Sequence, residues 1–314
     1  MAEVILNLLP LKSGERAAFE AAAPEAVHIY SRRSTVTPEQ LAQATVLFGW
    51  PRAQDMKYAE NLKWFQCMFA GVDEYLPQGV TPEGAVITTS SGSNALSVAE
   101  NMLSTLLALY RRLPLYRDNQ RAHLWHDEGA VKTITGAVIL VVGAGHLGTE
   151  FAWRCKALGA AKVVGVKRTV GKPLPGFDQL YTMEELDRLL PQADVVALTL
   201  PHSPATVRLM NADRIARMKD DAVLISTGRG TVLDQDALAR AMKGGKLWGA
   251  ALDVTEPEPL PADSPLWDIP NLLLTPHVAG GMRLEITRKN CVDMALANLK
   301  RYLAGQTLEN QVKR

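Results

Sequence analysis

The chain has 314 residues, of which 47% are hydrophobic and 21% charged, an ordinary globular composition with room for two domains. Its 34 Lys and Arg nearly balance its 33 Asp and Glu, and no block of like charge offers the basic face typical of nucleic-acid or anionic-membrane binding. No apolar run reaches the ~18 residues of a membrane span, so we expect a soluble protein.

The cellular compartment is indicated by the cysteines and the N-terminus. Cys67, Cys155 and Cys291 are odd in number, lie far apart and match no metal-ligand pattern, which favours free thiols in a reducing compartment and no metal site. Residues 1–10 lack the basic start and the cleavage site of a signal peptide. We therefore expect a cytoplasmic protein.

Short strand-like runs alternate with amphipathic segments over the first ninety residues, which predicts a parallel sheet with helices on both faces. A long helix is expected from about Asn94 to Arg112, with Pro114 stopping it. The strands predicted in this part are Val4–Leu8, Val27–Tyr30, Val46–Phe48, Trp64–Phe69 and Val86–Thr88.

The same alternation resumes after Ile134 and predicts a second α/β unit. Thr182–Glu185 has the pattern of a capping box that opens a helix to Leu190. Gly244 and Gly245 are expected to end a helix that starts near Asp234. The predicted strands are Val138–Val142, Val163–Val166, Val195–Leu198, Val223–Ser226, Trp248–Asp253 and Leu272–Leu274.

A glycine-rich turn follows the strand Val138–Val142 and precedes a helix-like segment and another strand. A G-x-G-x-x-G motif in that context is typical of dinucleotide binding, because Gly143 permits the tight turn, Gly145 the approach of a pyrophosphate and Gly148 close packing of helix on strand. The helix N-terminus attracts phosphate. The alternative is a glycine-rich turn in a non-binding domain. The cofactor residues predicted here are Gly143, Gly145, His146, Leu147 and Gly148.

The residues after the next strand indicate which nicotinamide cofactor is preferred. An NAD site usually has an acidic residue there, which bonds the ribose 2′-hydroxyl. This chain has Lys167, Arg168 and Thr169 instead, and two cations with a hydroxyl suit a 2′-phosphate. We therefore predict NADP(H); the alternative is a solvated basic turn in a protein that uses NAD(H).

Three later segments place polar chemistry directly after predicted strands, where open α/β sheets bind ligands. They are Thr227-Gly228-Arg229-Gly230, the run from Asp253 to Glu258, and Thr275-Pro276-His277. A histidine can donate a proton near neutral pH, a carboxylate can orient it, and an arginine can hold a carboxylate and polarise a carbonyl. The alternatives without a catalytic role are a surface ion pair for Arg229, a core histidine for His277 and an acidic loop residue for Glu258.

The ordered set of G-x-G-x-x-G, Gly-Arg-Gly, Glu-Pro-Leu and Pro-His resembles the D-isomer-specific 2-hydroxyacid dehydrogenase family, over nearly the whole chain and most densely from 143 to 281. The resemblance implies hydride transfer from a nicotinamide cofactor to a small 2-oxo acid, such as glyoxylate or hydroxypyruvate, yielding the D-2-hydroxy acid. It identifies Arg229, Glu258 and His277 as catalytic, with Glu258 preferred to Glu256. The short reductases of the family are the nearest in pattern.

The resemblance also implies roles for residues outside this triad. Phe69–Asp73 resembles a substrate-carboxylate loop, in which Ala70 and Gly71 contact the substrate together with Arg229 and His277. Asn94 and Glu100 match the polar start of an interdomain helix. For Trp125 we expect a packing role, with a place in the substrate pocket as the alternative. Further cofactor contacts are implied for Leu200, Pro201, Thr206, Thr227, Gly228, Gly280 and Asp253, the last holding the carboxamide.

The expected architecture is two doubly wound parallel-sheet domains, one Rossmann and one flavodoxin-like, with a cleft that closes Ala70 and Gly71 over the cofactor. Residues 1–95 plus 286–314 form a discontinuous substrate domain, because a helix from about Met282 to Leu303 can return to the first unit. Residues 96–285 bind the dinucleotide. Family members are usually homodimers, so we expect one. The rival hypothesis is a catalytically silent dinucleotide-sensing scaffold of the same fold.

Overall fold

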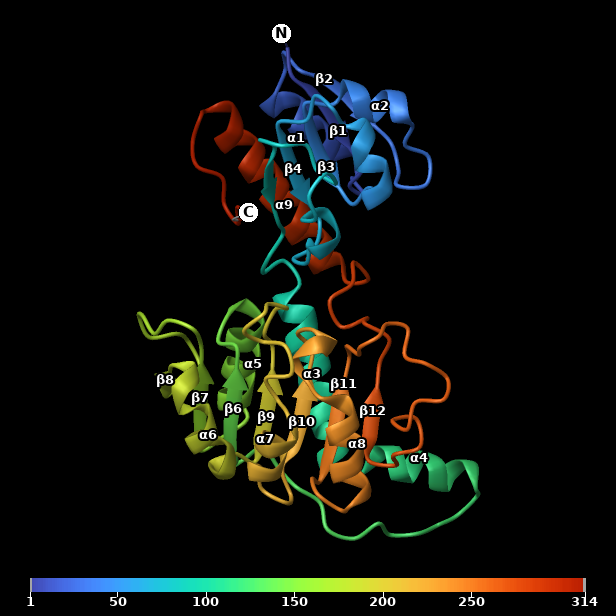
Figure 1. Cartoon of the computed structure of the whole chain (residues 1–314), viewed down its shortest axis with the longest axis vertical. Coiled ribbons are helices and arrows are strands. Elements are labelled where there is room, and N and C mark those ends of the chain that lie inside the picture. The colour runs from blue at the N-terminus through green and yellow to red at the C-terminus, as the bar shows by residue number, and fades with distance from the viewer. Residues whose placement is uncertain (1, 313–314) are drawn as a thin grey trace. The chain divides into compact units, whose positions relative to one another are not determined.

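A computed structural model describes residues 2–312, and the chain divides into two compact α/β units (Figure 1). Unit 1 comprises 1–94 and 282–314, and unit 2 comprises 95–281. The boundary predicted after residue 285 falls inside the last helix, whereas the unit changes before that helix begins. A helix packs through a stripe that runs its whole length, so it joins one unit entire.

Unit 1 is built on a five-stranded parallel sheet of order β2-β1-β3-β4-β5, the flavodoxin-like order. Its strands are β1 (Val4–Asn7), β2 (Val27–Tyr30), β3 (Val46–Gly49), β4 (Trp64–Cys67) and β5 (Val86–Thr88). Its helices are α1 (Ser13–Ala22), α2 (Pro38–Gln43), the 3₁₀ turns η1 (Ala53–Tyr58) and η2 (Asp73–Tyr75), and α9 (Glu285–Leu303).

The last helix returns to unit 1, as predicted. Cys291, Val292, Ala295 and Leu299 of α9 are buried in one core with α1 and with strand residues that include Trp64. The opposite face of the sheet packs on α2, η1 and η2. A segment from the end of the chain therefore completes one of the two layers of this unit.

Unit 2 is built on a seven-stranded parallel sheet of order β12-β11-β10-β9-β6-β7-β8, which contains the doubly wound Rossmann order. Its strands are β6 (Val138–Val142), β7 (Lys162–Val166), β8 (Gln179–Tyr181), β9 (Val195–Leu198), β10 (Val223–Ser226), β11 (Gly249–Leu252) and β12 (Leu272–Leu274). Its helices are α3 (Ala95–Tyr110), α4 (Leu113–Arg121), α5 (His146–Ala157), α6 (Leu186–Leu189), α7 (Ala212–Arg217) and α8 (Gln235–Lys243), with 3₁₀ turns η3 (Met183–Glu185), η4 (Leu190–Gln192) and η5 (Gly230–Val232).

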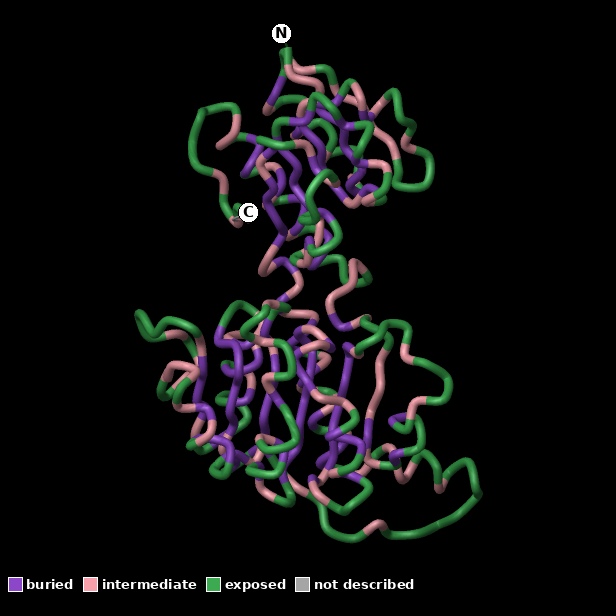
Figure 2. The backbone as a smooth tube through the Cα atoms, viewed as in Figure 1, coloured by how far each residue is buried: buried purple, intermediate pink, exposed green. Residues whose placement is uncertain are grey.

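Both faces of this sheet are covered, which explains why its strands are continuous apolar runs. Ile139 and Val141 of β6 pack toward α3 and α5, while Leu140 and Val142 pack toward α6, α7 and α8. Figure 2 shows the strands of both units as buried backbone and the connecting loops as mostly exposed. The predicted fold class, two parallel-sheet α/β domains, is confirmed.

Local predictions failed in three places. The long helix α3 ends at Tyr110, before Pro114. Pro114 does not stop a helix, since it lies in the first turn of α4, where a missing N–H costs nothing. Thr182 makes no side-chain cap, and the segment begins as the 3₁₀ turn η3. Strand β8 was not predicted: its residues are exposed or half-buried, as expected at the edge of a sheet.

The three cysteines are free and buried. Burial raises the pKa of the Cys67 and Cys155 thiols to about 12, and that of Cys291 to about 11. All three are therefore protonated near neutral pH and behave as small apolar side chains. No helix within residues 2–312 is both long and apolar enough to cross a membrane.

Candidate active site

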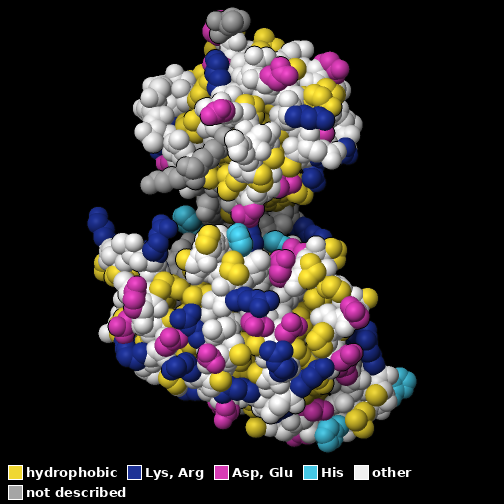
Figure 3. Space-filling view, viewed as in Figure 1, with side chains coloured by type: hydrophobic (Ala, Val, Ile, Leu, Met, Phe, Trp, Pro, Cys, Tyr) yellow, Lys and Arg dark blue, Asp and Glu magenta, His cyan; other side chains and the backbone are white. Residues whose placement is uncertain are grey.

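The sequence-predicted site residues of unit 2 lie on one edge of its sheet, because they all follow the carboxyl ends of parallel strands. Along the sheet, His277 follows β12, Asp253 follows β11 and Arg229 follows β10. The glycine turn follows β6, and Lys167 follows the neighbouring strand β7. Figure 3 shows histidine side chains gathered along this edge. The strand order reverses between β6 and β9, the position at which doubly wound sheets bind nucleotides.

The three glycines of the motif have different surroundings. Gly143 has a φ of +114°, which favours glycine. A Cβ on Gly148 would lie 2.5 Å from the Gly143 carbonyl oxygen, so only glycine lets α5 pack this closely. A Cβ on Gly145 would meet nothing within 4 Å, so open space lies beside this residue. His146, exposed, and Leu147, half-buried, begin helix α5, which has no side-chain cap.

The geometry fits a dinucleotide. The uncapped start of α5 presents backbone N–H groups without an intrahelical partner, which suit a pyrophosphate. The buried Thr227 hydroxyl has no hydrogen-bond partner among the described residues. Such an orphaned group is costly unless a ligand or a water completes it. The turn also leaves open space at Gly145, where the backbone can approach a phosphate.

The remaining predicted cofactor residues border the same edge. Lys167 is half-buried, and Arg168 and Thr169 are exposed on the loop after β7. Leu200 is buried and Pro201 exposed after β9. The Thr206 hydroxyl donates to the Pro201 carbonyl oxygen at 2.8 Å, which folds that loop on itself. Gly280 lies in the loop that follows His277.

Glycines on both sides of Arg229 permit close contacts between loops. A Cβ on Gly228 would lie 2.2 Å from the Leu200 carbonyl oxygen, and one on Gly230 would lie 2.1 Å from the Thr255 carbonyl group. The Arg229 backbone is therefore held between the loops after β9 and β11. Its Nη1 donates to the Gly228 carbonyl oxygen at 2.9 Å. The Gly-Arg-Gly pattern thus has a packing cause besides the chemistry of arginine.

His277 and Glu258 form the central contact of the site. His277 Nδ1 lies 2.8 Å from Glu258 Oε2, and both side chains are partly exposed. The other oxygen, Glu258 Oε1, accepts the Thr255 backbone N–H at 3.0 Å. Because one carboxylate oxygen is fixed by the backbone, the second holds the imidazole in one orientation. Glu256 is not the partner of His277.

Asp253 organises the turn that carries His277. Its Oδ1 accepts the Thr275 hydroxyl at 2.6 Å and the Val278 N–H at 3.0 Å, and its Oδ2 accepts the Ala279 N–H at 3.1 Å. The residue is only 4% exposed. The backbone N–H of His277 donates to the Asp253 carbonyl oxygen at 2.8 Å, and His277 has a φ of +49°. These bonds hold a strained backbone, so Asp253 positions the turn that carries His277, while its contact with a carboxamide stays a prediction.

The predicted substrate loop belongs to unit 1. Ala70 is exposed and Gly71 half-buried just beyond β4. The start of the loop is held from behind: the Ser90 hydroxyl donates to the Cys67 carbonyl oxygen at 2.9 Å, and Cys291 Sγ to that of Met68 at 3.3 Å. The closure of this loop over a cofactor stays a prediction. Asn94 ends unit 1, and Glu100 is exposed on α3.

Sequence reasoning missed residues that support the site. Thr199 Oγ1 donates to the Gly143 carbonyl oxygen at 2.7 Å and so fixes the glycine turn from the next strand of the sheet. Thr275 lies in a segment that the sequence singles out, but its hydrogen bond to Asp253 was not predicted. Both are polar residues placed directly after an apolar strand, and that position is the signal that could have revealed them. The packing role expected for Trp125 is not found within the described part of the chain, where this side chain is fully exposed, at 102%.

Comparison with known proteins agrees with this geometry. Residues 103–279 match the family profile described as D-isomer specific 2-hydroxyacid dehydrogenase, NAD binding domain. A glyoxylate/hydroxypyruvate reductase B of Yersinia pestis is 30% identical over 87% of this chain and 84% of its own length. A family member from Aeromonas salmonicida has a solved structure with a TM-score of 0.86, 31% identity and coverage of 100% of this chain and 99% of that one.

A second solved structure, a D-isomer specific 2-hydroxyacid dehydrogenase from Xanthobacter autotrophicus in complex with NADPH, has a TM-score of 0.81 and 30% identity, and the match covers 100% of this chain and 98% of that one. The profile match spans more than half of the chain and includes the glycine turn, Arg229 and His277. The chain therefore belongs to the D-isomer-specific 2-hydroxyacid dehydrogenase family of NAD(P)-dependent oxidoreductases.

Proposed function

We propose that this protein reduces a small 2-oxo acid, of the glyoxylate or hydroxypyruvate type, to the D-2-hydroxy acid with NADPH. The observation that carries the proposal is the 2.8 Å contact between His277 and Glu258 on the sheet edge that also bears Arg229 and the glycine turn. A proton donor, an orienting carboxylate, a guanidinium and a dinucleotide cradle are the groups that such a reduction requires.

The reduction adds a hydride to C2 of the substrate and a proton to its oxygen. A bound nicotinamide cofactor would supply the hydride. His277 uses Nδ1 to contact Glu258, which leaves Nε2 to give the proton to the developing alkoxide. Glu258 fixes the orientation and the plane of the ring. Arg229 offers a forked donor to the substrate carboxylate and to the carbonyl oxygen, and Ala70 and Gly71 hold the carboxylate from the substrate loop.

We propose that Asp253 is a positioning residue, which holds the turn that carries His277. Its carboxylate is used by the Thr275 hydroxyl and by the backbone N–H groups of Val278 and Ala279. The imidazole therefore starts from a turn that cannot easily relax. Loss of those bonds would affect His277 through its backbone, without removing any group that touches the substrate.

The direct test measures NADPH oxidation with glyoxylate, hydroxypyruvate, pyruvate and phenylpyruvate, comparing the wild type with His277→Ala. We expect turnover by the wild type and a loss of ~10²–10⁴-fold in kcat for the variant, the usual contribution of a general acid. The cofactor Kd should be unchanged. Full activity of His277→Ala would refute the role of that residue. Cofactor binding without turnover of any 2-oxo acid would favour the silent scaffold.

The preference for NADPH is supported by the basic loop after β7. Lys167 and Arg168 stand beside the glycine turn, since β6 and β7 are neighbours in the sheet. Lys167→Asp should weaken NADPH binding by ~10-fold or more and leave NADH binding similar, because a carboxylate repels a 2′-phosphate but accepts a ribose hydroxyl. Equal turnover of the wild type with both cofactors would contradict the preference.

We also propose a homodimer formed through α4 and the segment that follows it. Helix α4 has no buried residue; Leu113 at its start is 55% exposed, and Leu124 in the segment after it is 53% exposed. A cavity of ≈ 610 Å³ lies between the helix and this segment, lined by Tyr116 and Trp125 among others. Figure 1 shows α4 and its long connection to β6 at the amino end of the strands of unit 2. A helix without a buried face is poorly stable alone, and a second copy would cover it.

A further inference from the structure

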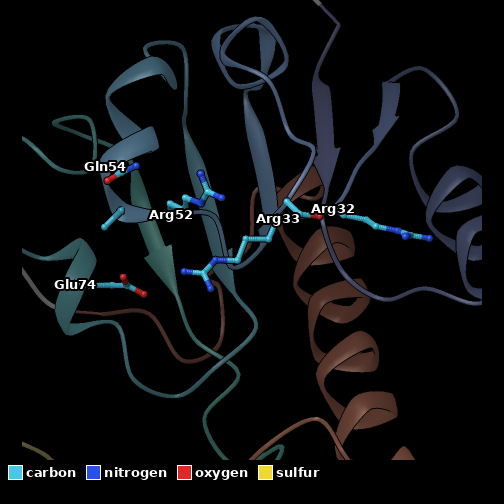
Figure 4. Close-up of a pocket in the computed structure, with 7 residues that line it drawn as sticks. Arg32, Arg33, Arg52, Gln54 and Glu74 are labelled. Carbon is cyan, nitrogen blue, oxygen red and sulfur yellow. The ribbon is translucent and has the colours of Figure 1, made fainter. Parts of the chain in front are cut away.

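The carboxyl edge of the sheet in unit 1 holds a basic cavity of ≈ 820 Å³, for which the proposed chemistry gives no use. It lies beyond the ends of β2 and β3, and its lining includes Arg32, Arg33, Arg52, Gln54 and Glu74 (Figure 4). Three arginines thus share the cavity with one carboxylate, although the whole chain has a formal charge of only +1. Such a concentration of cations favours an anionic ligand.

The carboxylate of the cavity does not neutralise the arginines. Glu74 Oε1 accepts a hydrogen bond from Trp50 Nε1 at 2.6 Å. Within residues 2–312, none of the ion pairs includes Arg33 or Arg52. Both guanidinium groups therefore keep donors that can serve an anion.

Arg33 is held in a defined place. Its guanidinium carbon lies 3.6 Å from the centre of the Trp50 ring. Stacking uses the face of the guanidinium and leaves the N–H groups at its edge available for a forked contact with phosphate or carboxylate. Figure 4 shows the side chains of Arg33 and Arg52 on the side of Glu74, whereas that of Arg32 extends the opposite way.

Aromatic contacts connect this cavity to the loop assigned to the substrate carboxylate. The Trp50 and Phe69 rings meet edge to face, with their centres 4.9 Å apart. Phe69 directly precedes Ala70 and Gly71 of this loop. Glu74 lies just after the loop, in the 3₁₀ turn η2. A molecule whose first carboxylate lies at Ala70 and Gly71 therefore has Arg33 and Arg52 on the same edge of the same sheet.

We propose that Arg33 and Arg52 form a subsite for a second anionic group, a phosphate or a carboxylate, at the end of the substrate remote from its 2-oxo acid. The inference rests on the proposed function and extends its substrate range to small 2-oxo acids that carry an anionic distal group. Forked, charge-assisted hydrogen bonds are the interaction that arginine gives to either group. Arg32 has no part in this subsite, because its guanidinium extends away from the other two.

The test compares matched substrates with NADPH. Hydroxypyruvate is compared with its 3-phosphate, and 2-oxopentanoate with 2-oxoglutarate, so that each pair differs mainly in the distal charge. In one of the pairs, we expect kcat/KM to be ~10-fold or more higher for the member with the distal anionic group, as one or two charge-assisted hydrogen bonds would give. The pair that shows the preference identifies the group as a phosphate or a carboxylate.

The variants locate the effect. Arg33→Gln and Arg52→Gln should each lower the preference for the anionic member by ~10-fold, chiefly through KM. Arg32→Gln, a matched loss of charge next in sequence, should keep it. Equal kcat/KM within both pairs, or a preference that survives both Arg33→Gln and Arg52→Gln, would overturn the subsite.

Calorimetric titration with inorganic phosphate, and separately with glutarate, provides a readout that needs no turnover. Wild-type binding of one of them that Arg52→Gln abolishes and Arg32→Gln keeps would support the subsite. No binding of either would count against it. If this anion binds but no 2-oxo acid is reduced, the proposed function has failed and the anion site remains. If the protein reduces only 2-oxo acids without a distal anionic group, the subsite has failed and the proposed function remains.

Discussion

Two glycines of one motif, Gly145 and Gly148, have separate tasks. A Cβ on Gly148 would collide with the Gly143 carbonyl oxygen and with Val141 Cγ1, at 2.5 and 2.8 Å. A Cβ on Gly145 would meet no protein atom within 4 Å, and its backbone does not need a left-handed conformation. Gly148 is therefore required by the fold itself, and Gly145 by a ligand that approaches the turn from outside.

This difference gives a paired prediction. Gly148→Ala should lower the free energy of unfolding by roughly 1–3 kcal/mol, the usual cost of overpacking a tight contact, and weaken cofactor binding as the turn shifts. Gly145→Ala should leave stability within about 0.5 kcal/mol of wild type, as for a surface site, yet weaken cofactor binding. Denaturant unfolding and cofactor titration measure the two quantities. Unchanged cofactor affinity in Gly145→Ala would argue against a phosphate at this turn.

The residue types of the site were predictable from the sequence, and their partners only in part. A family pattern predicts His277 and Glu258, and the structure places them in contact. The engagement of Asp253 by the 275–279 turn was not foreseen. Periodicity and motif spacing place a residue at a strand end, but a hydrogen bond depends on loop geometry that no local pattern encodes.

At the level of elements, helix α9 is tied to α1 by one arginine. Arg288, 9% exposed, donates to both carboxylate oxygens of Glu15 at 2.8 Å. It also donates to Glu285 Oε1 at 2.7 Å and to the Pro10 carbonyl oxygen at 3.2 Å. The helix that returns from the far end of the chain is therefore fixed by a charged network as well as by its apolar core.

Arg288→Met should lower the free energy of unfolding at pH 7 by roughly 1–3 kcal/mol, because it leaves Glu15 without its charged partner. Hydrogen bonding to Arg288 lowers the pKa of Glu15, and the same partner with Lys12 lowers the pKa of Glu285 to about 2. Folded carboxyl groups with lowered pKa values stabilise the protein above their unfolded pKa of ~4.3, and this contribution is lost as the pH falls through the folded pKa.

The effect of Arg288→Met should therefore shrink between about pH 5 and pH 2, the interval in which those carboxylates become protonated. Urea unfolding followed by circular dichroism at several pH values measures it. Arg301→Met is the matched control on the same helix, since its pair with Glu309 is partly exposed and should contribute about 0–1 kcal/mol. A difference that stays constant with pH would show that Arg288 stabilises the helix by packing alone.

At the level of the whole molecule, the chain builds two α/β units, and the first is completed only by its last helix. Helix α4 has no buried residue, and the segment 122–131 that follows it in unit 2 is almost entirely exposed. The proposed homodimer would bury this surface, and the fully exposed Trp125 would be its main apolar anchor. Exposed aromatic side chains of this kind often dominate the energetics of an interface.

Trp125→Ser should weaken self-association by ~10-fold or more, as expected for truncation of an interface anchor. Sedimentation velocity over a range of protein concentrations measures the dissociation constant. Trp153→Ser on α5, where the tryptophan is 54% exposed, is the matched control and should associate like the wild type. If Trp125→Ser assembles as the wild type does, α4 and its connection are not the interface.

The sequence by itself determined the alternation of strands and helices, the parallel character of both sheets and the glycine turn, and it supports the prediction that Arg229, Glu258 and His277 are the catalytic residues. Those features follow from apolar periodicity, from turn chemistry and from motifs that are local in the chain. Only the tertiary structure decided the short edge strand β8, the exposure of Trp125, the stacking of Arg33 on Trp50 and the place of Arg33 and Arg52 in one cavity. These depend on contacts between segments distant in sequence, whose free energies no local pattern contains.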